Sequence, residues 1–208
     1  MNKRIEIISN YINETDKIAD IGCDQALLSE VLAKRNIYSI ASDIKKTIVD
    51  SAQKRIGDLN LSEYVKFIVS DGVKKIDDSV DTVVLSGMGT YTILKILKDS
   101  NKQYKKVITI SNNNHDILRT KMLELGYEID KEEIIYEKSK FYNLILFKIG
   151  YCEYSEEEVL FGKNHQNSEL FIKKIEYDLN KYKKIYKLNK SKDTYRKIEI
   201  IEKRLECH

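Results

Sequence analysis

The sequence predicts an α/β protein with a doubly wound, mostly parallel sheet, followed by a C-terminal helical hairpin. Short apolar runs that resemble strands alternate with helix-period segments as far as about residue 149. Repeated strand–helix alternation is typical of βαβ units. Strand signals then vanish, and apolar residues recur roughly every 3.5 positions up to the end of the chain. We therefore expect an α/β domain over residues 1–150 and a helical, coiled-coil-like domain over residues 151–208.

The order of the expected elements follows from these two periodicities. Runs rich in Ile and Val that are bounded by polar residues indicate strands, whereas apolar residues at spacings of three and four indicate helices. In chain order we expect helix 5–12, strand 17–21, helix 27–32, strand 37–42, helix 48–56, strand 64–69, strand 80–85, helix 93–97, strand 106–110, helix 117–125, and strands 127–136 and 141–149. The last two strands are joined by a short turn, which predicts an antiparallel hairpin at one edge of the sheet.

The C-terminal part carries most of the basic excess of the chain. Residues 160–208 contain 13 Lys and Arg against 7 Asp and Glu, although the net charge of the whole chain is only +3. A polar interruption at 189–192 divides the periodic segment into two helices. Two interpretations stay open: a capping appendage with a solvated basic face, or a surface that contacts nucleic acid through its phosphates.

Composition excludes several classes of protein. A chain of 208 residues with 42% hydrophobic residues can form one full domain and a small appendage. No apolar run approaches 18 residues and the N-terminus lacks a secretory pattern, so we expect neither a membrane span nor export. The three cysteines and three histidines are scattered, which predicts no metal site and no disulfide framework. We expect a cytoplasmic protein that is a monomer or a weak dimer.

The turn after the first strand is the most informative segment. An apolar strand runs into an acidic turn with one glycine, Asp20-Ile-Gly-Cys-Asp24, and an amphipathic helix follows. About 20 residues after Gly22, a second apolar run ends at Asp43. The G-x-G-x-x-G pattern that brings backbone amides onto a pyrophosphate is absent. A cofactor with a ribose and no phosphates therefore fits better, and S-adenosylmethionine is the obvious one.

Each polar residue at these strand ends has a possible role beside a structural alternative. Asp20 can accept from the ammonium of an amino-acid moiety, and Gly22 lets the backbone approach a ligand. Asp43 can accept from both ribose hydroxyls, and Asp71-Gly72 can place a carboxylate near an adenine amino group. The structural alternative for Asp20 and Gly22 is a tight turn with a helix cap. For Asp43 it is a surface acid after a strand, and for Asp71-Gly72 it is an ordinary turn.

Two further strand ends extend the pattern. Ser86-Gly-Met-Gly89 follows the fourth strand, where its glycines would leave room for a flat ligand. Ser111-Asn-Asn-Asn114 follows the fifth strand, and asparagine can both donate to and accept from a base edge. A core methionine and helix-capping residues are the structural alternatives. The order of these motifs at successive strand ends predicts a ligand site along the carboxyl edge of the sheet.

Several of these segments together resemble a known bacterial family. They are Asp20-Ile-Gly-Cys-Asp-Gln25, Ala41-Ser-Asp43, Ser70-Asp-Gly72, Asp81-Thr-Val-Val-Leu-Ser-Gly-Met-Gly89 and Ser155-Glu-Glu-Glu-Val-Leu-Phe-Gly162. The chain looks like a member of the tRNA (adenine-22 N1)-methyltransferase family over nearly its whole length. The resemblance implies a Rossmann-like domain, S-adenosylmethionine as cofactor, and tRNA as the substrate that is methylated on N1 of adenine 22.

The resemblance also implies roles for individual residues. Asp24 would accept from the adenine N6 amine or stabilise the cationic product, and Met88 and Gly89, with Asn112, would line the adenine slot. The residues expected to bind the cofactor are Asp20, Gly22, Asp43, Ile44, Asp71, Gly72, Ser86 and Gly87. The chain departs from the family where Gln25 replaces a usual histidine, Thr90 a frequent glycine and Ser111 a frequent proline. Gln25 can form hydrogen bonds, but it cannot act as a titrating base.

Two other functions remain possible at this point. One is a methyltransferase that acts on a small molecule, and the other is a catalytically degenerate fold that binds RNA. Adenine N1 lies on the Watson–Crick edge, so methylation there requires an unpaired or flipped base.

Overall fold

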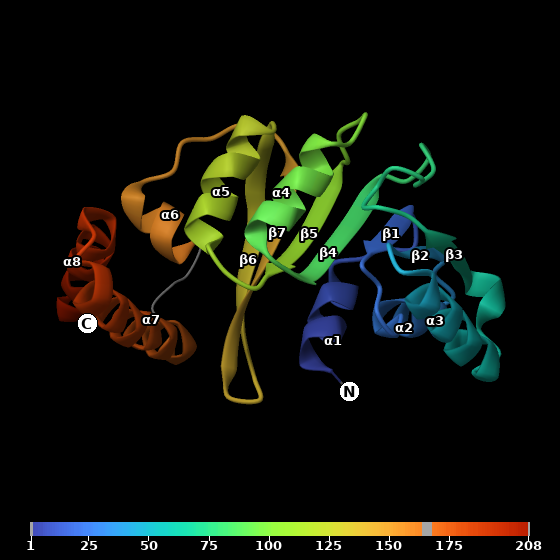
Figure 1. The fold of residues 1–208 in the computed structure, drawn as a ribbon, viewed down its shortest axis with the longest axis horizontal. Helices are drawn as coiled ribbons and strands as arrows, with labels where there is room; N and C mark the ends of the chain where they lie inside the picture. The colour runs from blue at the N-terminus through green and yellow to red at the C-terminus, as the bar shows by residue number, and fades with distance from the viewer. Residues whose placement is uncertain (1, 164–167, 208) are drawn as a thin grey trace.

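One seven-stranded sheet forms the centre of the molecule, as Figure 1 shows. The computed structural model describes residues 2–163 and 168–207. The strands lie in the order β3-β2-β1-β4-β5-β7-β6. Their bounds are β1 Ile18–Ile21, β2 Ser39–Asp43, β3 Val65–Val69, β4 Thr82–Met88, β5 Lys106–Ser111, β6 Tyr127–Glu137 and β7 Lys140–Ile149.

Helices cover both faces of this sheet, as expected for a doubly wound fold. The helices are α1 Lys3–Asn10, α2 Leu27–Ala33, α3 Lys46–Asp58, α4 Thr90–Lys98, α5 His115–Glu124, α6 Glu156–Phe161, α7 Glu169–Asn189 and α8 Lys192–Glu206, with a short 3-10 turn at Ser62–Tyr64. Helices α4 and α5 bury Ile93, Leu118 and Met122 against one face. On the other face, α1 and α2 contribute Ile8 and Leu32 to a second cluster.

The strand order reverses between β1 and β4. From β1 the chain moves outward to β2 and β3, and then β4 returns to the opposite side of β1, parallel to it. The return runs through residues 70–81, which form turns without a helix. Such a reversal leaves a crevice at the carboxyl ends of the strands, because the two connections diverge to opposite sides.

The predicted antiparallel edge is confirmed. Strand β7 pairs antiparallel with both β5 and β6, and β6 forms the edge. Lys138 and Ser139 connect β6 to β7, and both have positive φ values, of 49° and 61°. A two-residue loop of this kind matches the right-handed twist of the strands that it joins.

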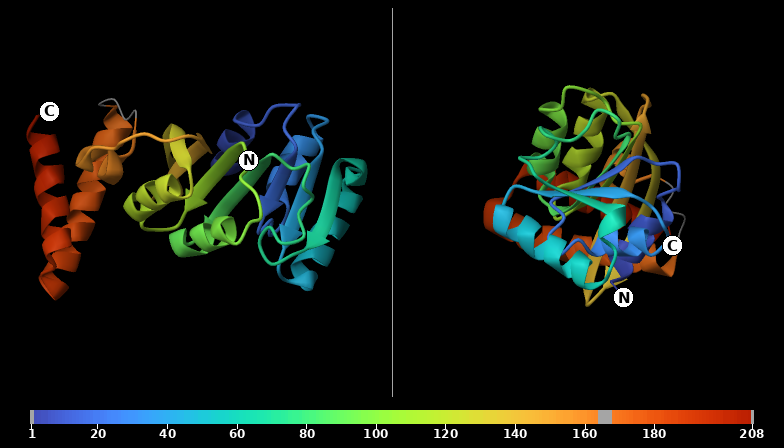
Figure 2. Two further views of the ribbon diagram at one scale, coloured as in Figure 1. Left: turned by 90° about the horizontal axis from the view of Figure 1, so that it is seen from above. Right: turned by 90° about the vertical axis from the view of Figure 1, so that its right-hand side faces the viewer.

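The C-terminal part contains three described helices, whereas the sequence pattern predicted two. The additional helix, α6, begins with a capping box in which Ser155 Oγ accepts from the Glu158 amide and a Glu158 carboxylate oxygen accepts from the Ser155 amide. A helix of six residues is too short to show a periodic pattern, although Ser-x-x-Glu is a start signal. Figure 2 shows that α7 and α8 stand beyond the β6 edge of the sheet.

A buried ion pair connects this helical part to the sheet. Arg119 on α5 donates from Nε to Glu132 on β6 over 2.9 Å, and both side chains are almost fully buried. The second guanidinium branch donates to the carbonyl groups of Val159 and Leu160 at the end of α6. The other Glu132 oxygen accepts from the Lys163 amide over 2.6 Å. One pair of side chains therefore joins α5, β6 and the segment that leads into α7.

No helix within residues 2–163 and 168–207 is long and apolar enough to cross a membrane.

The buried pair predicts a large loss of stability when one partner is neutralised. Glu132→Gln leaves the Arg119 charge buried without its counterion, so we expect the free energy of unfolding to fall by about 3–5 kcal/mol. Urea unfolding followed by circular dichroism measures this loss. Glu124→Gln is the control, because Glu124 lies on α5, the helix that carries Arg119, and forms an exposed pair with Lys121. Its effect should stay within about 0.5 kcal/mol. Equal losses of stability in the two variants would show that the buried Arg119–Glu132 pair contributes no more than an exposed pair.

Candidate functional site

A cavity of about 550 Å³ lies at the carboxyl edge of the sheet, where β1, β2 and β3 end and α4 begins. We call it the switch-point cavity, because it lies beside the reversal of strand order. Six residues that the sequence singled out line it: Gly22, Asp43, Ile44, Asp71, Gly72 and Met88. Helix α4 closes the opposite side with Tyr91, Thr92, Lys95 and Ile96. Four separate strand ends thus form one concave site.

Two glycines keep this cavity open. Gly22 has a φ of +77°, and a Cβ there would lie 2.9 Å from Cε of Met88. Gly72 has a φ of +59°, and a Cβ there would lie 3.0 Å from Ile96. A side chain at either position would strain the backbone and fill space between the strand ends and the next element. These glycines therefore hold a cradle that a ligand backbone or ring can enter.

Three carboxylates that the sequence singled out at the ends of β1, β2 and β3 have different environments, and two of them, Asp43 and Asp71, line the cavity. Asp20 is buried, and burial, followed by the charge of Asp43, raises its pKa to about 7. Asp43 is half-buried and accepts from the Lys45 amide over 3.0 Å. Asp71 is exposed and paired with Lys74, whose hydrogen bond lowers the pKa of Asp71. Because Asp20 can change protonation near neutral pH, a cationic ligand group beside it would favour its ionised form.

The end of β4 is irregular and is fixed by the neighbouring loop. Its pairing with β5 shifts register between Ser86 and Met88, and Gly87 between them has a φ of +81°. The strand therefore extends three residues beyond its predicted end at position 85. Asn112 donates from its side-chain amide to the Gly87 carbonyl over 2.8 Å and from its backbone amide to the Met88 carbonyl over 3.0 Å. Asn112 thus holds the bulge from the outside.

A second and larger cavity, of about 680 Å³, lies on the other side of this bulge. We call it the hairpin cavity, because α7 and α8 form one of its walls. Gly87 and Asn112 line its near end, and the far wall includes Lys174 and Tyr182 on α7 and Lys197 on α8. Met88 lines the first cavity and Gly87 lines the second. The two cavities therefore meet at the carboxyl end of β4.

The walls of the hairpin cavity are basic, and its acids are paired. Lys197 forms ion pairs with Asp116 over 2.8 Å and with Asp193 over 2.7 Å. Lys174 pairs with Asp178 along α7. Burial, followed by the charges of Arg119 and Lys174, lowers the pKa of His115 to about 3, so this wall residue is neutral. The cationic lining suits an anionic ligand.

The remaining predicted residues occupy other places. Asp24 is exposed with a φ of 47°, in the turn that follows Gly22. Neither Asp24 nor Ser86 nor the buried Asp20 belongs to the wall of either cavity. Their assigned roles stay predictions. The sequence reasoning missed Asn143, Lys174 and Tyr182 in the hairpin cavity, although a polar Asn143 inside the apolar run of β7 was a signal.

Cys23 packs in a small core cluster with Ala26 and Ala41. Within residues 2–163 and 168–207 no group of His, Cys, Asp and Glu could hold a metal ion. His165 and His208, which the sequence reasoning considered as dispersed histidines, lie outside the described residues.

Comparisons with known proteins agree with this arrangement. A family model described as a methyltransferase domain matches residues 1–145. A Bacillus subtilis protein, tRNA (adenine(22)-N(1))-methyltransferase, is 26% identical over 156 residues, which is 72% of this chain and 66% of that relative. The chain thus spans slightly less than two thirds of the length of this curated relative.

Two solved structures match along almost the whole chain. TrmK of M. capricolum, in complex with S-adenosyl-homocysteine, has a TM-score of 0.87 and 28% identity, covering 99% of this chain and 98% of its own. A Streptococcus pneumoniae protein in complex with S-adenosyl-L-methionine has a TM-score of 0.90 and 25% identity, covering 99% of both chains. The likeness includes the helical part, which the family model does not cover.

The buried Asp20 predicts a specific dependence of stability on pH. The pKa of an aspartate in an unfolded chain is about 3.9, and folding raises that of Asp20 to about 7. Its stabilising contribution is therefore present below pH 4 and lost as the pH rises to 7, at about 1.4 kcal/mol per pH unit. We expect Asp20→Asn to unfold at higher urea concentration than the wild type at pH 8, with the difference shrinking toward pH 4. Parallel stability curves for the two proteins would show that Asp20 is already ionised.

Proposed function

The chain belongs to the methyltransferase-domain family, and we propose that it transfers the methyl group of S-adenosylmethionine to N1 of adenine 22 in tRNA. The observation that carries this proposal is the meeting of two cavities at the end of β4. Methyl transfer is an in-line displacement, so donor and acceptor must approach from opposite sides of one point. The likeness to the B. subtilis enzyme and to the M. capricolum protein supports the choice of substrate.

The switch-point cavity fits the cofactor. Gly22 and Met88 both line this cavity, at the crevice between β1 and β4 where a ligand can enter. In this proposal Asp43 accepts from the ribose hydroxyls, with Ile44 beside it, and Asp71 with Gly72 faces the adenine amine. Asp20 lies behind the cradle and balances the ammonium group through its ionised form. When bound, S-adenosylmethionine supplies an electrophilic methyl group on a sulfonium centre.

The end of β4 orients the acceptor. Met88 separates the two cavities, and the bulge turns the Gly87 carbonyl toward Asn112. The sequence reasoning placed Ser86 and Gly87 beside the cofactor, but Gly87 lines the hairpin cavity instead of the switch-point cavity. We therefore assign the adenine slot to Gly87, Met88 and Asn112, with Ser86 supporting the bulge from within the strand. Neutral adenine N1 is the nucleophile, so no base has to remove a proton before the attack. The residues of this edge contribute mainly by positioning the ring and excluding water.

Asp24 is assigned to the charge that develops on the adenine. Alkylation makes the ring cationic and acidifies its N6 amine, which a carboxylate can stabilise. Asp24 lies in the turn after Gly22 and is exposed, so RNA bound along this edge would cover it. The neighbouring Gln25 is also exposed, and its backbone carbonyl accepts from Arg55 over 3.1 Å. Because a glutamine side chain cannot take up a proton, we assign the role of accepting from the N6 amine to Asp24 and not to Gln25.

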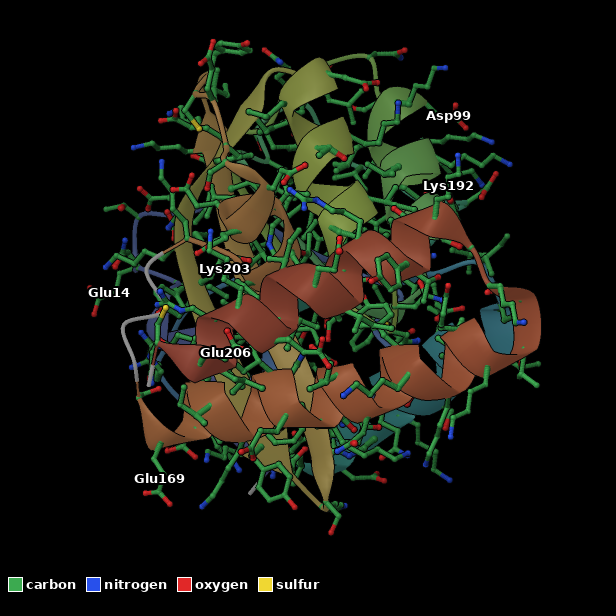
Figure 3. The ribbon with its side chains drawn as sticks, turned by 90° about the vertical axis from the view of Figure 1, so that its left-hand side faces the viewer. Glu14, Asp99, Glu169, Lys192, Lys203 and Glu206 are labelled. Atoms are coloured by element: carbon green, nitrogen blue, oxygen red, sulfur yellow. The ribbon has the colours of Figure 1, made fainter. Side chains whose placement is uncertain are left out.

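The helical part, 151–208, is proposed as the tRNA-binding domain beside the catalytic domain, 1–150. Residues 181–192, from the end of α7 to the first residue of α8, form a basic tip that contains no acid and six exposed lysines: Lys181, Lys183, Lys184, Lys187, Lys190 and Lys192. Of these, Lys183 pairs with Glu202 on α8. Figure 3 shows Lys192 at the start of α8, beside the end of α7. Exposed lysines on a rigid hairpin suit phosphate contacts and recognition by shape. We propose that the protein acts in the cytoplasm, as a monomer or weak dimer.

Nucleoside analysis of tRNA tests the proposed reaction directly. Unmodified tRNA is incubated with enzyme and S-adenosylmethionine, digested to nucleosides and analysed by mass spectrometry. We expect 1-methyladenosine to form from one adenine, and tRNA in which adenine 22 is replaced by guanine should gain none. A methylated small molecule in place of methylated tRNA would identify the rival small-molecule enzyme. Absence of any transfer, with intact cofactor binding, would identify a degenerate RNA-binding fold.

Asp24→Ala in the same assay should lower the rate of methyl transfer by at least about a hundredfold, the lower range for a positioned acid or base. Cofactor affinity measured by calorimetry should change little, because Asp24 lies outside the switch-point cavity. Glu14→Ala, which removes another exposed carboxylate, is the control. A rate close to that of the wild type would remove Asp24 from the reaction.

Asp43→Ala should weaken cofactor binding by about tenfold to a hundredfold, because two charge-assisted hydrogen bonds to the ribose are lost. Isothermal titration with S-adenosylmethionine measures the change. Asp50→Ala removes an exposed carboxylate that is paired with Lys46 on α3 and should leave the affinity unaltered. Unchanged affinity of the Asp43 variant would place the ribose elsewhere.

The basic tip predicts that tRNA binding depends on salt concentration. Replacing Lys184, Lys187 and Lys190 by Glu should weaken tRNA binding by at least about tenfold and reduce the slope of log K against log salt by about two. Gel shifts over a range of salt concentrations measure both quantities. The matched control replaces Lys34, Lys98 and Lys105, which are exposed lysines near the amino edge of the sheet. If both triple variants weaken binding equally, the effect is one of net charge and not of the tip.

A further inference from the structure

The hairpin cavity is larger than a slot for one base requires. It extends from Gly87 and Asn112, at the proposed acceptor end, to Lys197 on α8. Its volume of about 680 Å³ falls in the range that accommodates a whole small-molecule ligand. The adenine slot occupies only the end beside β4, so the part between β7 and α7 is available to another group.

One buried polar group in that part lacks a partner. Asn143 lies on β7, is only 5% exposed, and belongs to the cavity wall. Its side-chain oxygen accepts no hydrogen bond from any residue in 2–163 or 168–207. Buried amide oxygens are nearly always satisfied, so a group that forms hydrogen bonds is expected here. An asparagine amide can pair with the edge of a nucleobase by donating and accepting together.

Aromatic rings lie at the outer side of the same cavity. Phe141 on β7 and Tyr177 on α7 both line it, and their ring centroids are 5.5 Å apart. Tyr177 is 54% exposed, so its ring is accessible at the cavity mouth. Aromatic side chains of this kind are where unstacked RNA bases stack. A base on this platform would have its polar edge available to the strand behind it.

Charge favours a nucleotide over a neutral ligand. Lys174 and Lys181 project from α7 into the cavity wall, and Arg4 and Lys140 line its opposite side. Asp178 and Asp116, two acids of the wall, are paired with Lys174 and Lys197. Lys181 and Lys140 form no ion pair within the described part of the chain, so they remain available to a phosphate.

We propose that the hairpin cavity holds a nucleotide that flanks the methylated adenine. Asn143 bonds to the edge of its base, Phe141 and Tyr177 stack on the ring, and Lys181 contacts its phosphate. The site fixes which sequence next to the target is accepted. This inference rests on the proposed function, because it takes the near end of the cavity as the adenine slot.

The test is a double-mutant cycle between the protein and the RNA. Transcripts of a substrate tRNA carry an abasic nucleotide at position 21 or at position 23, and kcat/KM is compared with that of intact tRNA. The comparison is made for the wild type, Asn143→Ala and Tyr177→Ala. Any effect of the abasic nucleotide on the fold of the RNA is common to all enzymes and cancels in the cycle. Asn101→Ala, an exposed asparagine near the amino edge of the sheet, is the matched control.

At one of the two positions, we expect removal of the base to lower kcat/KM about tenfold less for each cavity variant than for the wild type. This difference is the effect of one lost hydrogen bond or stacking contact. Calorimetry with S-adenosylmethionine shows whether each variant is folded. If Asn143→Ala is not folded, the more exposed Tyr177→Ala decides. Coupling below threefold at both positions in every folded variant overturns the inference, whereas a wild type inactive on intact tRNA overturns the proposed function instead.

Discussion

The reversal of strand order between β1 and β4 is the constraint on which the rest of this structure depends. The strands that follow in the chain lie on opposite sides of β1, so their connections run to opposite sides of the sheet. A crevice therefore opens between these connections at the carboxyl ends of the strands. Gly22 and Met88 face each other across it, at a distance that leaves no room for a Cβ on the glycine. Glycine is favoured at position 22 because its φ of +77° would strain any other residue, and because a side chain there would displace Met88.

The bulge at the end of β4 turns one crevice into two sites. A regular strand would point successive side chains to opposite faces and end at a single edge. The register shift between Ser86 and Met88, with the positive φ of Gly87, instead exposes backbone to one cavity and the methionine to the other. Asn112 donates to the carbonyl groups of both Gly87 and Met88, so the shape of this strand end depends on the loop after β5 as well as on β4. In the proposed reaction, the two ligands occupy different cavities and their reacting atoms meet at this strand end.

Much of the switch-point cavity could be predicted from the sequence, and most of the hairpin cavity could not. Gly22, Asp43 and Gly72 follow strands whose apolar runs are plain, and parallel topology brings their ends together without further information. The hairpin cavity is different, because Lys174 is distant in sequence from Asn143 and meets it only when α7 docks. Periodicity shows that α7 has an apolar face, but not which surface that face covers. The buried Arg119–Glu132 pair, which fixes the end of α6 and Lys163 ahead of α7, appears in the sequence as two ordinary charges.

The strength of that docking decides how the two proposed activities are coupled. The Lys197–Asp116 pair is partly exposed, so salt and bound phosphates can weaken it. The Arg119–Glu132 pair is fully buried and is joined by hydrogen bonds to the backbone of α6, so it is screened much less. Phe161, Phe171 and Ile201 add an apolar cluster shared by α6, α7 and α8. If RNA binds the basic tip as proposed, it can disturb the outer ion pairs while the buried Arg119–Glu132 pair keeps the base of the hairpin in place. In that proposal, the fixed separation between the tip and the end of β4 lets the enzyme select RNA by shape before any base is contacted.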